Sequence, residues 1–311
     1  MEDKIKVILD TDPGVDDTIA LMFFMFDPRI DVKLITTVSG NRPLEINSRN
    51  TMHLLEKFGR CDIPVALGAN KPLKRARKDA SFIHSASGMG HYTPTEPTKI
   101  KPIKDPAWEA MYKTIMENKN EIIICLQGPH TNMAKCLMAH PDCAQYVKQI
   151  IYEGGSPYGY KGIAPHISFN ASSDPEAMKI VLESGIPIVM IPSEMGRIHT
   201  YLSYKQVMKI ENANDVGKFI GEMFDAYWEP GYEDKRIAMN DSCIYFYLVE
   251  PKMFKGYRAD IDLDINEFPG KTVMDFKKDG KYLILMSAKR NRSFKYLYSL
   301  VKKLDDYKFY E

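Results

Sequence analysis

The sequence lacks the features of a disulfide-rich, membrane-spanning or nucleic-acid-binding protein. Its five cysteines are an odd number without a Cys-x-x-Cys pair, which indicates neither a disulfide framework nor a zinc ribbon. Lysine and arginine number 42 against 41 acidic residues, so no nucleic-acid polymer or membrane surface is expected as a partner. No run approaches the roughly 20 apolar residues of a membrane span, and the acidic N-terminus is unlike a secretory signal. We expect a reduced, cytoplasmic protein.

The composition is that of an ordinary globular protein, with 44% hydrophobic and 27% charged residues. The length of 311 residues favours one large domain covering 1–311. Short apolar runs alternate with longer amphipathic segments, which predicts an open, Rossmann-like α/β fold with a mostly parallel central sheet and helices on both faces. The expected strands are 4–9, 31–38, 121–126, 148–152 and 186–191, with 260–265 and 282–286 as candidates, and the expected helices are 18–26, 44–58, 175–184 and 292–304.

The strongest chemical feature is a cluster of four aspartates that directly follows the first expected strand. Asp10, Asp12, Asp16 and Asp17 fall within eight residues around a Pro-Gly turn. Carboxylates packed so closely repel one another unless a cation neutralises them, and oxygen ligands suit Ca²⁺ or Mg²⁺. A helix cap would need only one aspartate. The spacing matches neither an EF-hand loop nor a phosphate-binding P-loop. The cluster therefore predicts a metal or catalytic site.

Four further polar stretches are candidates for the same site, although each has a simpler structural interpretation. Asn41 follows the second expected strand and is equally typical of a turn. In the stretch 127–132, Thr131 or Asn132 would also cap a helix at 133–138. In the stretch 169–177, Asp174 before a proline is typical of an N-cap, which leaves Asn170 as the functional candidate. The stretch 240–242 precedes another apolar run, where an aspartate is often a cap.

Taken together, these stretches resemble the nucleoside hydrolase family, often described as inosine–uridine preferring. The family's opening motif, Asp-Thr-Asp-Pro-Gly-x-Asp-Asp, is complete at 10–17, and the other stretches follow in the family's order up to residue 251. The resemblance implies hydrolysis of the N-glycosidic bond of a small-molecule nucleoside or nucleotide, and a homodimer or homotetramer.

The resemblance also implies a ligand set and substrate contacts. Ca²⁺ would be bound by Asp12, Asp17, Asp241 and the backbone carbonyl of Thr131, with Asp10 behind them. Ribose hydroxyls would be held by Asp16, Asn41 and Asn170. Asp12 would be the general base toward an attacking water. Cleavage through a cationic ribosyl group is consistent with this arrangement.

The sequence departs from the family where the 5′ end of the sugar is bound. Gly162 and Ser168 stand where the family has Asn and Glu, which grip the sugar near its 5′-hydroxyl. The change removes a negative charge and opens space, and His166 lies between the two positions. This favours a substrate that is larger or anionic at this end, such as a nucleoside 5′-monophosphate.

A second departure concerns the leaving base. Asn240 stands where many members have a histidine that protonates the base, and an amide cannot act as an acid. His84, in a stretch similar to the family's loop over the active site, is the alternative proton donor. Trp228, in an aromatic stretch at 227–232, would stack on the base or simply pack in the core. These changes favour a non-standard substrate, such as the modified nucleoside queuosine, in nucleoside or base salvage.

Three other functions remain open at this point. The chain would be an ordinary inosine or uridine hydrolase if the departures have no consequence for the substrate. A phosphatase of the haloacid dehalogenase type shares an Asp-x-Asp opening but leaves Asp16 and Asp17 unexplained. A nucleoside- or ribose-binding protein without catalysis would hold its ligand without releasing free base, so turnover distinguishes it.

Overall fold

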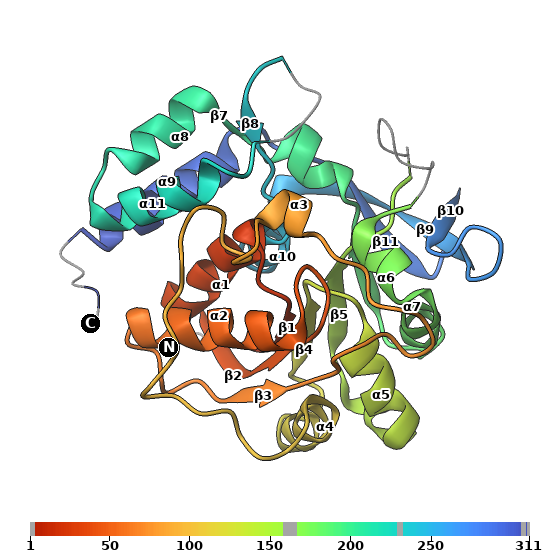
Figure 1. The fold of residues 1–311 in the computed structure, drawn as a ribbon. Helices are drawn as coiled ribbons and strands as arrows, with labels where there is room; N and C mark the ends of the chain where they lie inside the picture. The colour runs from red at the N-terminus through yellow and green to blue at the C-terminus, as the bar shows by residue number, and fades with distance from the viewer. Residues whose placement is uncertain (1–3, 158–166, 229–232, 306–308, 310–311) are drawn as a thin grey trace.

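A nine-stranded sheet forms the centre of the computed structural model, which describes residues 4–157, 167–228, 233–305 and 309. Across the sheet the strand order is β10-β9-β11-β6-β5-β4-β1-β2-β3 (Figure 1). The strands are β1 (Ile5–Thr11), β2 (Ile30–Thr37), β3 (Val65–Leu67), β4 (Ile123–Leu126), β5 (Gln149–Glu153), β6 (Ile188–Ile191), β9 (Phe254–Asp264), β10 (Lys271–Phe276) and β11 (Tyr282–Ala288).

The strands from β3 to β11 across the sheet run parallel, and β9 pairs antiparallel with both β11 and β10. A separate antiparallel pair joins β7 (Leu202–Ser203) to β8 (Arg236–Ile237). The prediction of an open, mostly parallel sheet is therefore confirmed.

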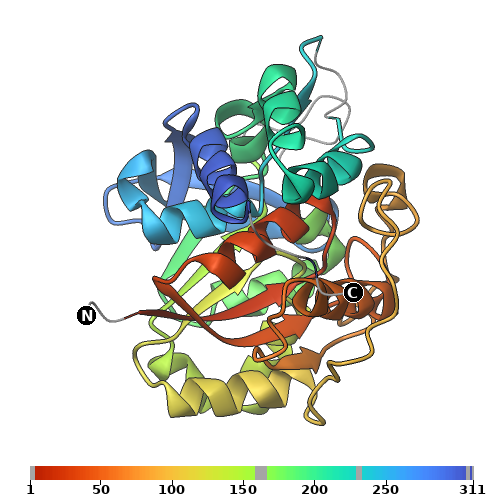
Figure 2. The same ribbon diagram turned by 90° about the vertical axis from the view of Figure 1, so that its left-hand side faces the viewer.

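Helices cover both faces of the sheet. In Figure 2 the yellow helix α4 lies on one side of it and the red helix α1 on the other. Among the described residues, no helix combines the length and apolar character needed to cross a bilayer. The α-helices are α1 (Val15–Phe26), α2 (Leu44–Lys57), α3 (Ser81–His84), α4 (Ala107–Glu117), α5 (Thr131–Ala139), α6 (Phe169–Ser173), α7 (Pro175–Leu182), α8 (Tyr204–Glu211), α9 (Asp215–Phe224), α10 (Ser242–Val249) and α11 (Arg292–Lys303).

Two apolar layers hold this arrangement together, one on each face of the sheet. Side chains alternate between faces along a strand, so Leu9 and Cys125 pack with α1 and α10, whereas Ile8 and Ile124 pack with α4 and α5. All four are fully buried, which explains why the central strands are continuously apolar. Each buried aliphatic side chain stabilises the fold by about 1.5–3 kcal/mol.

The expected elements are confirmed, most with small shifts at their ends, although the strand expected at 260–265 is β9, which begins already at Phe254. The strand expected at 31–38 is β2, that at 148–152 is β5, and the helix expected at 292–304 is α11. No strand or helix is predicted from the sequence at the positions of β3, α4, α8, α9 or β10. Because parallel strands end at one edge of the sheet, the polar segments after β1, β2, β4, β5 and β6 meet there.

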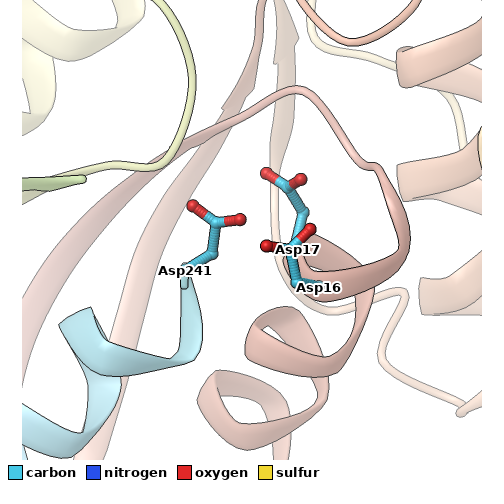
Figure 3. A group of neighbouring side chains, drawn as sticks. All are labelled: Asp16, Asp17 and Asp241. Carbon is cyan, nitrogen blue, oxygen red and sulfur yellow. The ribbon is translucent and has the colours of Figure 1, made fainter. Parts of the chain in front are cut away.

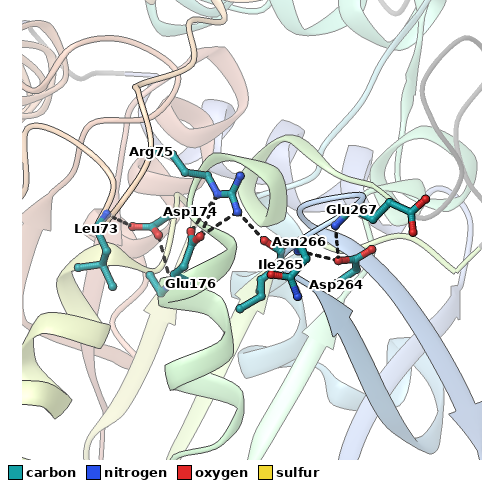
Figure 4. Close-up of polar contacts among 9 residues, drawn as sticks. Leu73, Arg75, Asp174, Glu176, Asp264, Ile265, Asn266 and Glu267 are labelled. Carbon is teal, nitrogen blue, oxygen red and sulfur yellow. Dashed lines mark hydrogen bonds and ion pairs between the residues drawn. The ribbon is translucent and has the colours of Figure 1, made fainter.

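Asp174 ties this edge to neighbouring segments (Figure 4). As the N-cap of α7, its carboxylate accepts from the amide of Ala177 at 3.1 Å, which confirms the capping interpretation. It also accepts from the amide of Leu73 at 2.8 Å and from the hydroxyl of Thr131 at 2.7 Å. Beside it, Arg75 forms an ion pair with Glu176 at 2.8 Å. The carboxylate of Asp174 thus connects three chain segments near the edge at which the parallel strands end.

Replacing Asp174 by alanine is expected to lower the free energy of unfolding by about 2–4 kcal/mol, because two buried donors and one partly buried donor lose their acceptor. Urea denaturation measures this loss. The matched control is Asp215→Ala, which removes an exposed first-turn carboxylate from α9 and should cost less than about 1 kcal/mol. Equal losses in the two variants would contradict the role assigned to Asp174.

Candidate active site

Three carboxylates converge at the carboxyl edge of the sheet (Figure 3). Asp16 and Asp17 lie in the first turn of α1, and Asp241 immediately precedes α10. All three are buried, and each offers an oxygen within 4.8 Å of the others. Helix α1 packs against α10, so the packing of these helices brings together residues that are far apart in the sequence. Oxygen atoms in this arrangement are suited to a hard cation such as Ca²⁺.

Asp12 borders this group but is not one of the three. Its Oδ2 accepts a hydrogen bond from the amide of Asn41 at 2.7 Å, and its Oδ1 is buried without a partner among the described residues. The amide group of Asn41 donates to Asp17 Oδ2 at 3.0 Å. The resemblance places Asp12 among the metal ligands and Asp16 at the sugar. The converging trio instead contains Asp16, because Asp16 and Asp17 share one helical turn while Asp12 is held by the loop after β2.

Asp10 lies behind the cluster, near the end of β1. Its Oδ1 accepts from the hydroxyl of Thr36 at 2.5 Å and from the amide of Asn132 at 2.8 Å. The same Asn132 side chain donates to the carbonyl of Thr37 and accepts from the amide of Ala69. Asn132 therefore fixes the loops around Asp10 and does not cap α5.

The prediction of a side-chain cap for that helix is wrong. Helix α5 begins at Thr131 and has no side-chain cap hydrogen bond, because the hydroxyl of Thr131 is turned toward Asp174. Thr131 is buried.

The cluster has a strongly unfavourable electrostatic environment when it holds only protein atoms. Burial raises the pKa of Asp10 to about 7, and burial together with Asp16 raises the pKa of Asp17 to about 7. Burial and then Asp17 raise the pKa of both Asp12 and Asp241 well above the usual range. Asp10, Asp12 and Asp241 each keep one buried carboxylate oxygen without a hydrogen-bond partner in the described part of the chain. Such oxygens fit a bound cation, which would stabilise all of these charges at once.

A cavity of about 920 Å³ opens beside the carboxylates. Asp16 and Asp241 reach its wall, whereas Asp12 and Asp17 do not. The predicted site residues that line it are Asp16, Asn41, His84, Ser168, Asn170, Trp228, Asn240 and Asp241. Gly162 and His166 lie outside the described residues.

His84 and Tyr227 form one wall of the cavity. The backbone amide of Val15 donates to His84 Nδ1 at 3.2 Å, and the ring stacks on Tyr227 with 5.2 Å between centroids. Burial lowers the pKa of His84, which favours the neutral imidazole. With Nδ1 accepting, the ring proton is on Nε2, so His84 can donate a hydrogen bond from that atom.

Asn240 packs against Gly196, where a Cβ would come within 2.0 Å of its Oδ1. That oxygen is buried and has no hydrogen-bond partner among the described residues. Trp228, at the cavity wall, lies 5.7 Å from Tyr204 between ring centroids. Tyr227 and Trp228 therefore line the cavity and also pack against neighbouring aromatic rings.

Several cavity residues were not predicted as site residues, although Gln127 begins the candidate stretch 127–132. Gln127 follows β4, Glu153 ends β5, and Glu194 lies just beyond β6. Burial, only partly offset by a hydrogen bond from Ser193, raises the pKa of Glu153 to about 8. Ser156 donates to Glu194. Their position at strand ends was the available signal, but single polar residues beside apolar runs are too common to single out.

Solved structures share this architecture over nearly the whole chain. A plant nucleoside hydrolase, the PpNRh1 enzyme, superposes with a TM-score of 0.87 at 28% identity, covering 95% of this chain and 98% of that one. A purine-preferring ribonucleoside hydrolase from Gardnerella vaginalis gives the same TM-score at 22% identity, covering 96% and 99% of the two chains. The second comparison supports the fold alone.

Relatives with similar sequences are named as hydrolases of the same kind. Non-specific ribonucleoside hydrolase RihC of Salmonella typhimurium is 36% identical over 254 residues, which cover 82% of this chain and 81% of the relative. RihC of Escherichia coli O127:H6 is 36% identical over 251 residues, 81% of each chain. The family profile described as inosine-uridine preferring nucleoside hydrolase matches residues 7–311. The chain therefore belongs to the inosine-uridine preferring nucleoside hydrolase family, and it is a hydrolase of N-glycosyl bonds.

Proposed function

We propose that this enzyme uses Ca²⁺ to cleave the N-glycosidic bond of a ribonucleoside with a non-standard base, releasing free base and ribose for salvage. The observation that carries the proposal is the convergence of buried, incompletely hydrogen-bonded carboxylates beside a large cavity. The names of the relatives support a ribonucleoside as substrate.

Asp12, Asp17 and Asp241 are the proposed protein carboxylates for the cation, with the carbonyl of Thr131. Asp12 is kept in this set because its Oδ1 is buried and without a partner, and because it adjoins Asp17. Asp16 reaches the cavity wall, where a sugar hydroxyl would lie, so it is assigned to substrate binding. Asp10 does not line the cavity and supports the cluster through its contacts with Thr36 and Asn132.

Bound calcium would supply positive charge that orients the sugar diol and the attacking water. Asp12 Oδ1 would take the proton from that water. Asn41 fixes the carboxylates of Asp12 and Asp17 by donating to both, through its backbone and side chain respectively. Asn170, whose side-chain nitrogen donates to Gln127 O at 2.6 Å, is held rigidly at the cavity wall to position a ribose hydroxyl.

The base would lie between His84, Tyr227, Trp228 and Asn240. His84 Nε2 can donate a hydrogen bond to a base nitrogen as the glycosidic bond breaks. A cavity of about 920 Å³ is near the upper end of the range for small-molecule sites, about 300–1,000 Å³. This volume supports a base larger than hypoxanthine or uracil, such as the modified base of queuosine. An ordinary inosine or uridine hydrolase is the second candidate, supported by the non-specific relatives.

Free-base release in the presence of calcium is expected from at least one member of a panel of inosine, uridine and queuosine. Asp12→Asn should lower kcat by about 10²-fold or more, because the variant lacks the proton acceptor. Chromatography of the products measures both. A matched control is Asp142→Asn, an exposed residue that does not line the cavity, which should retain full activity. Tight nucleoside binding without release of any base would favour a binding protein and contradict the proposal.

His84→Gln should separate natural from activated leaving groups. Without the Nε2 donor, kcat/KM for the nucleoside cleaved fastest is expected to fall about 10- to 100-fold. The same variant should cleave p-nitrophenyl β-D-ribofuranoside almost normally, because p-nitrophenolate leaves without protonation. His91→Gln, at an exposed position, is the control. Equal losses on both substrates would assign His84 a purely structural role.

Calcium should raise the Tm of chelator-treated protein, and more so near about pH 8 than near about pH 5. The pKa values of Asp10 and Asp17 are raised to about 7 in the fold. Their contribution to stability is therefore complete below the unfolded pKa of about 4 and is lost as the pH rises through about 7. Above about pH 7, where Asp10 and Asp17 lose their protons, a bound cation would neutralise the carboxylates instead and restore the stability.

Differential scanning fluorimetry with calcium, magnesium or chelator measures this effect. Asp241→Asn should reduce the calcium-dependent shift, whereas Asp142→Asn should leave it unchanged. A calcium shift of the same size at both pH values would argue against binding at the buried carboxylates.

A further inference from the structure

The backbone of Ser85 is strained, directly after the histidine that lines the cavity. Ser85 ends helix α3 with φ 67° and ψ 174°, a combination that is essentially restricted to glycine. Among the described residues, the other non-glycine residues with positive φ are Asn120 and Asn291, and asparagine tolerates positive φ better than serine does. Strained backbone persists only where surrounding contacts hold it. Neighbouring residues must therefore hold the loop formed by residues 84–90.

This loop is closed by hydrogen bonds within it. The amide of Gly90 donates to His84 O at 3.1 Å, and the amide of Gly88 donates to Ser85 O at 3.2 Å. The hydroxyl of Ser87 donates to Gly90 O at 3.2 Å. These contacts make the loop one compact unit, so the position of Ser87 is linked to the position of His84.

Asn50 connects the loop to helix α2. Its side chain is fully buried, and its Nδ2 donates to Ser87 O at 2.9 Å. Arg49 donates to Asn50 Oδ1 at 2.9 Å and also to Ser87 O at 3.3 Å. The contact with Arg49 engages the oxygen of the Asn50 amide, so the nitrogen is the atom that faces Ser87. Asn50 thus fixes one carbonyl group in the middle of the loop.

Two glycines let the loop approach its other neighbours closely. A Cβ atom at Gly88 would lie 3.2 Å from Pro13 O, in the Pro-Gly turn of the aspartate cluster, and one at Gly90 would lie 2.2 Å from Met223 O in α9. Both glycines have positive φ, 81° and 62° respectively. The loop is therefore in contact with that turn and with α9, as well as with α2.

We propose that Asn50 is a positioning residue for His84. By holding Ser87 O, it keeps the loop closed against the strain at Ser85 and keeps His84 Nε2 directed toward the leaving base. The inference rests on the role proposed for His84 as a hydrogen-bond donor. Without Asn50, relaxation of Ser85 would move the chain next to His84 and weaken the hydrogen bond from Val15 to its ring. Asn50 does not line the cavity, so it acts through His84 and not by touching the substrate.

The first test compares Asn50→Ala with wild type on the nucleoside cleaved fastest and on p-nitrophenyl β-D-ribofuranoside. On the nucleoside, whose base needs the donor, kcat/KM should fall about 5- to 20-fold. On the nitrophenyl riboside it should stay within about threefold, which shows that the variant is folded. The control is Asn212→Ala, which removes an exposed asparagine that also donates to a backbone carbonyl, Met208 O at 2.7 Å, and should lose neither activity. Equal losses on both substrates, or no loss on the nucleoside, would overturn the inference.

A second substitution tests the strain itself. Glycine adopts the backbone conformation of Ser85 without strain, so Asn50→Ala combined with Ser85→Gly should recover most of the activity that Asn50→Ala loses on the nucleoside. The matched control combines Asn50→Ala with Ser85→Ala, which removes the same hydroxyl but keeps the Cβ atom, and should recover none of it. Recovery in both double variants, or in neither, would contradict the role of the strain.

A third measurement follows the ring of His84 without depending on catalysis. In the NMR spectrum of ¹⁵N-histidine-labelled enzyme, the signal of His84 is the one missing in His84→Gln. Wild type should show the tautomer with its proton on Nε2, because Nδ1 accepts from Val15. Asn50→Ala should show a mixture of both tautomers, and adding Ser85→Gly should reverse the change. An unchanged His84 signal in Asn50→Ala would overturn the inference.

Failure of the proposed hydrolysis is a separate outcome. If wild type released no base from any nucleoside and no nitrophenolate, the proposed function would be refuted. The ring signal of His84 in Asn50→Ala would still decide whether Asn50 positions that histidine.

Discussion

Burying several carboxylates at one end of the sheet has an electrostatic cost, and the contacts around the cluster and the adjoining cavity are best understood from that cost. Asp16, Asp17 and Asp241 converge because α1 packs against α10, and Asp12 lies beside them. Burial raises the pKa of Asp12, Asp17 and Asp241. Asn41 and Asn132 hold the cluster from two sides. In the proposed function, a bound cation would offset the repulsion among these carboxylates, and the substrate would occupy the cavity side of the cluster.

The same edge of the sheet forms the cavity that we propose for the substrate. The carboxyl ends of β4, β5 and β6 place Gln127, Glu153 and Glu194 along the cavity, next to the cluster at the end of β1. Helix α3, between β3 and α4, brings His84 to the wall of the same cavity. The carboxylate cluster and these cavity residues therefore lie on different strands of the sheet.

Much of the fold was predictable because the central strands are continuously apolar and the acidic motif follows the first of them. The runs that became β1, β2, β4, β5 and β6 needed no long-range information. Contacts between residues that are far apart in the sequence could not be predicted from one sequence. The register that sets Gln127 beside Glu153 depends on strand pairing, and the turn of Ser168 toward Gly155 depends on the loop. The convergence of Asp16 and Asp17 with Asp241 depends on the packing of α1 against α10, which a linear motif does not show.

The central claim is that the buried carboxylates hold the calcium needed for N-glycosidic cleavage. An anomalous difference map from crystals grown with calcium and ribose tests it most directly. The account predicts one ion about 2.3–2.6 Å from oxygens of Asp12, Asp17 and Asp241, with the sugar diol among its other ligands. An empty cluster in crystals that still cleave nucleoside at the same calcium concentration would contradict the account.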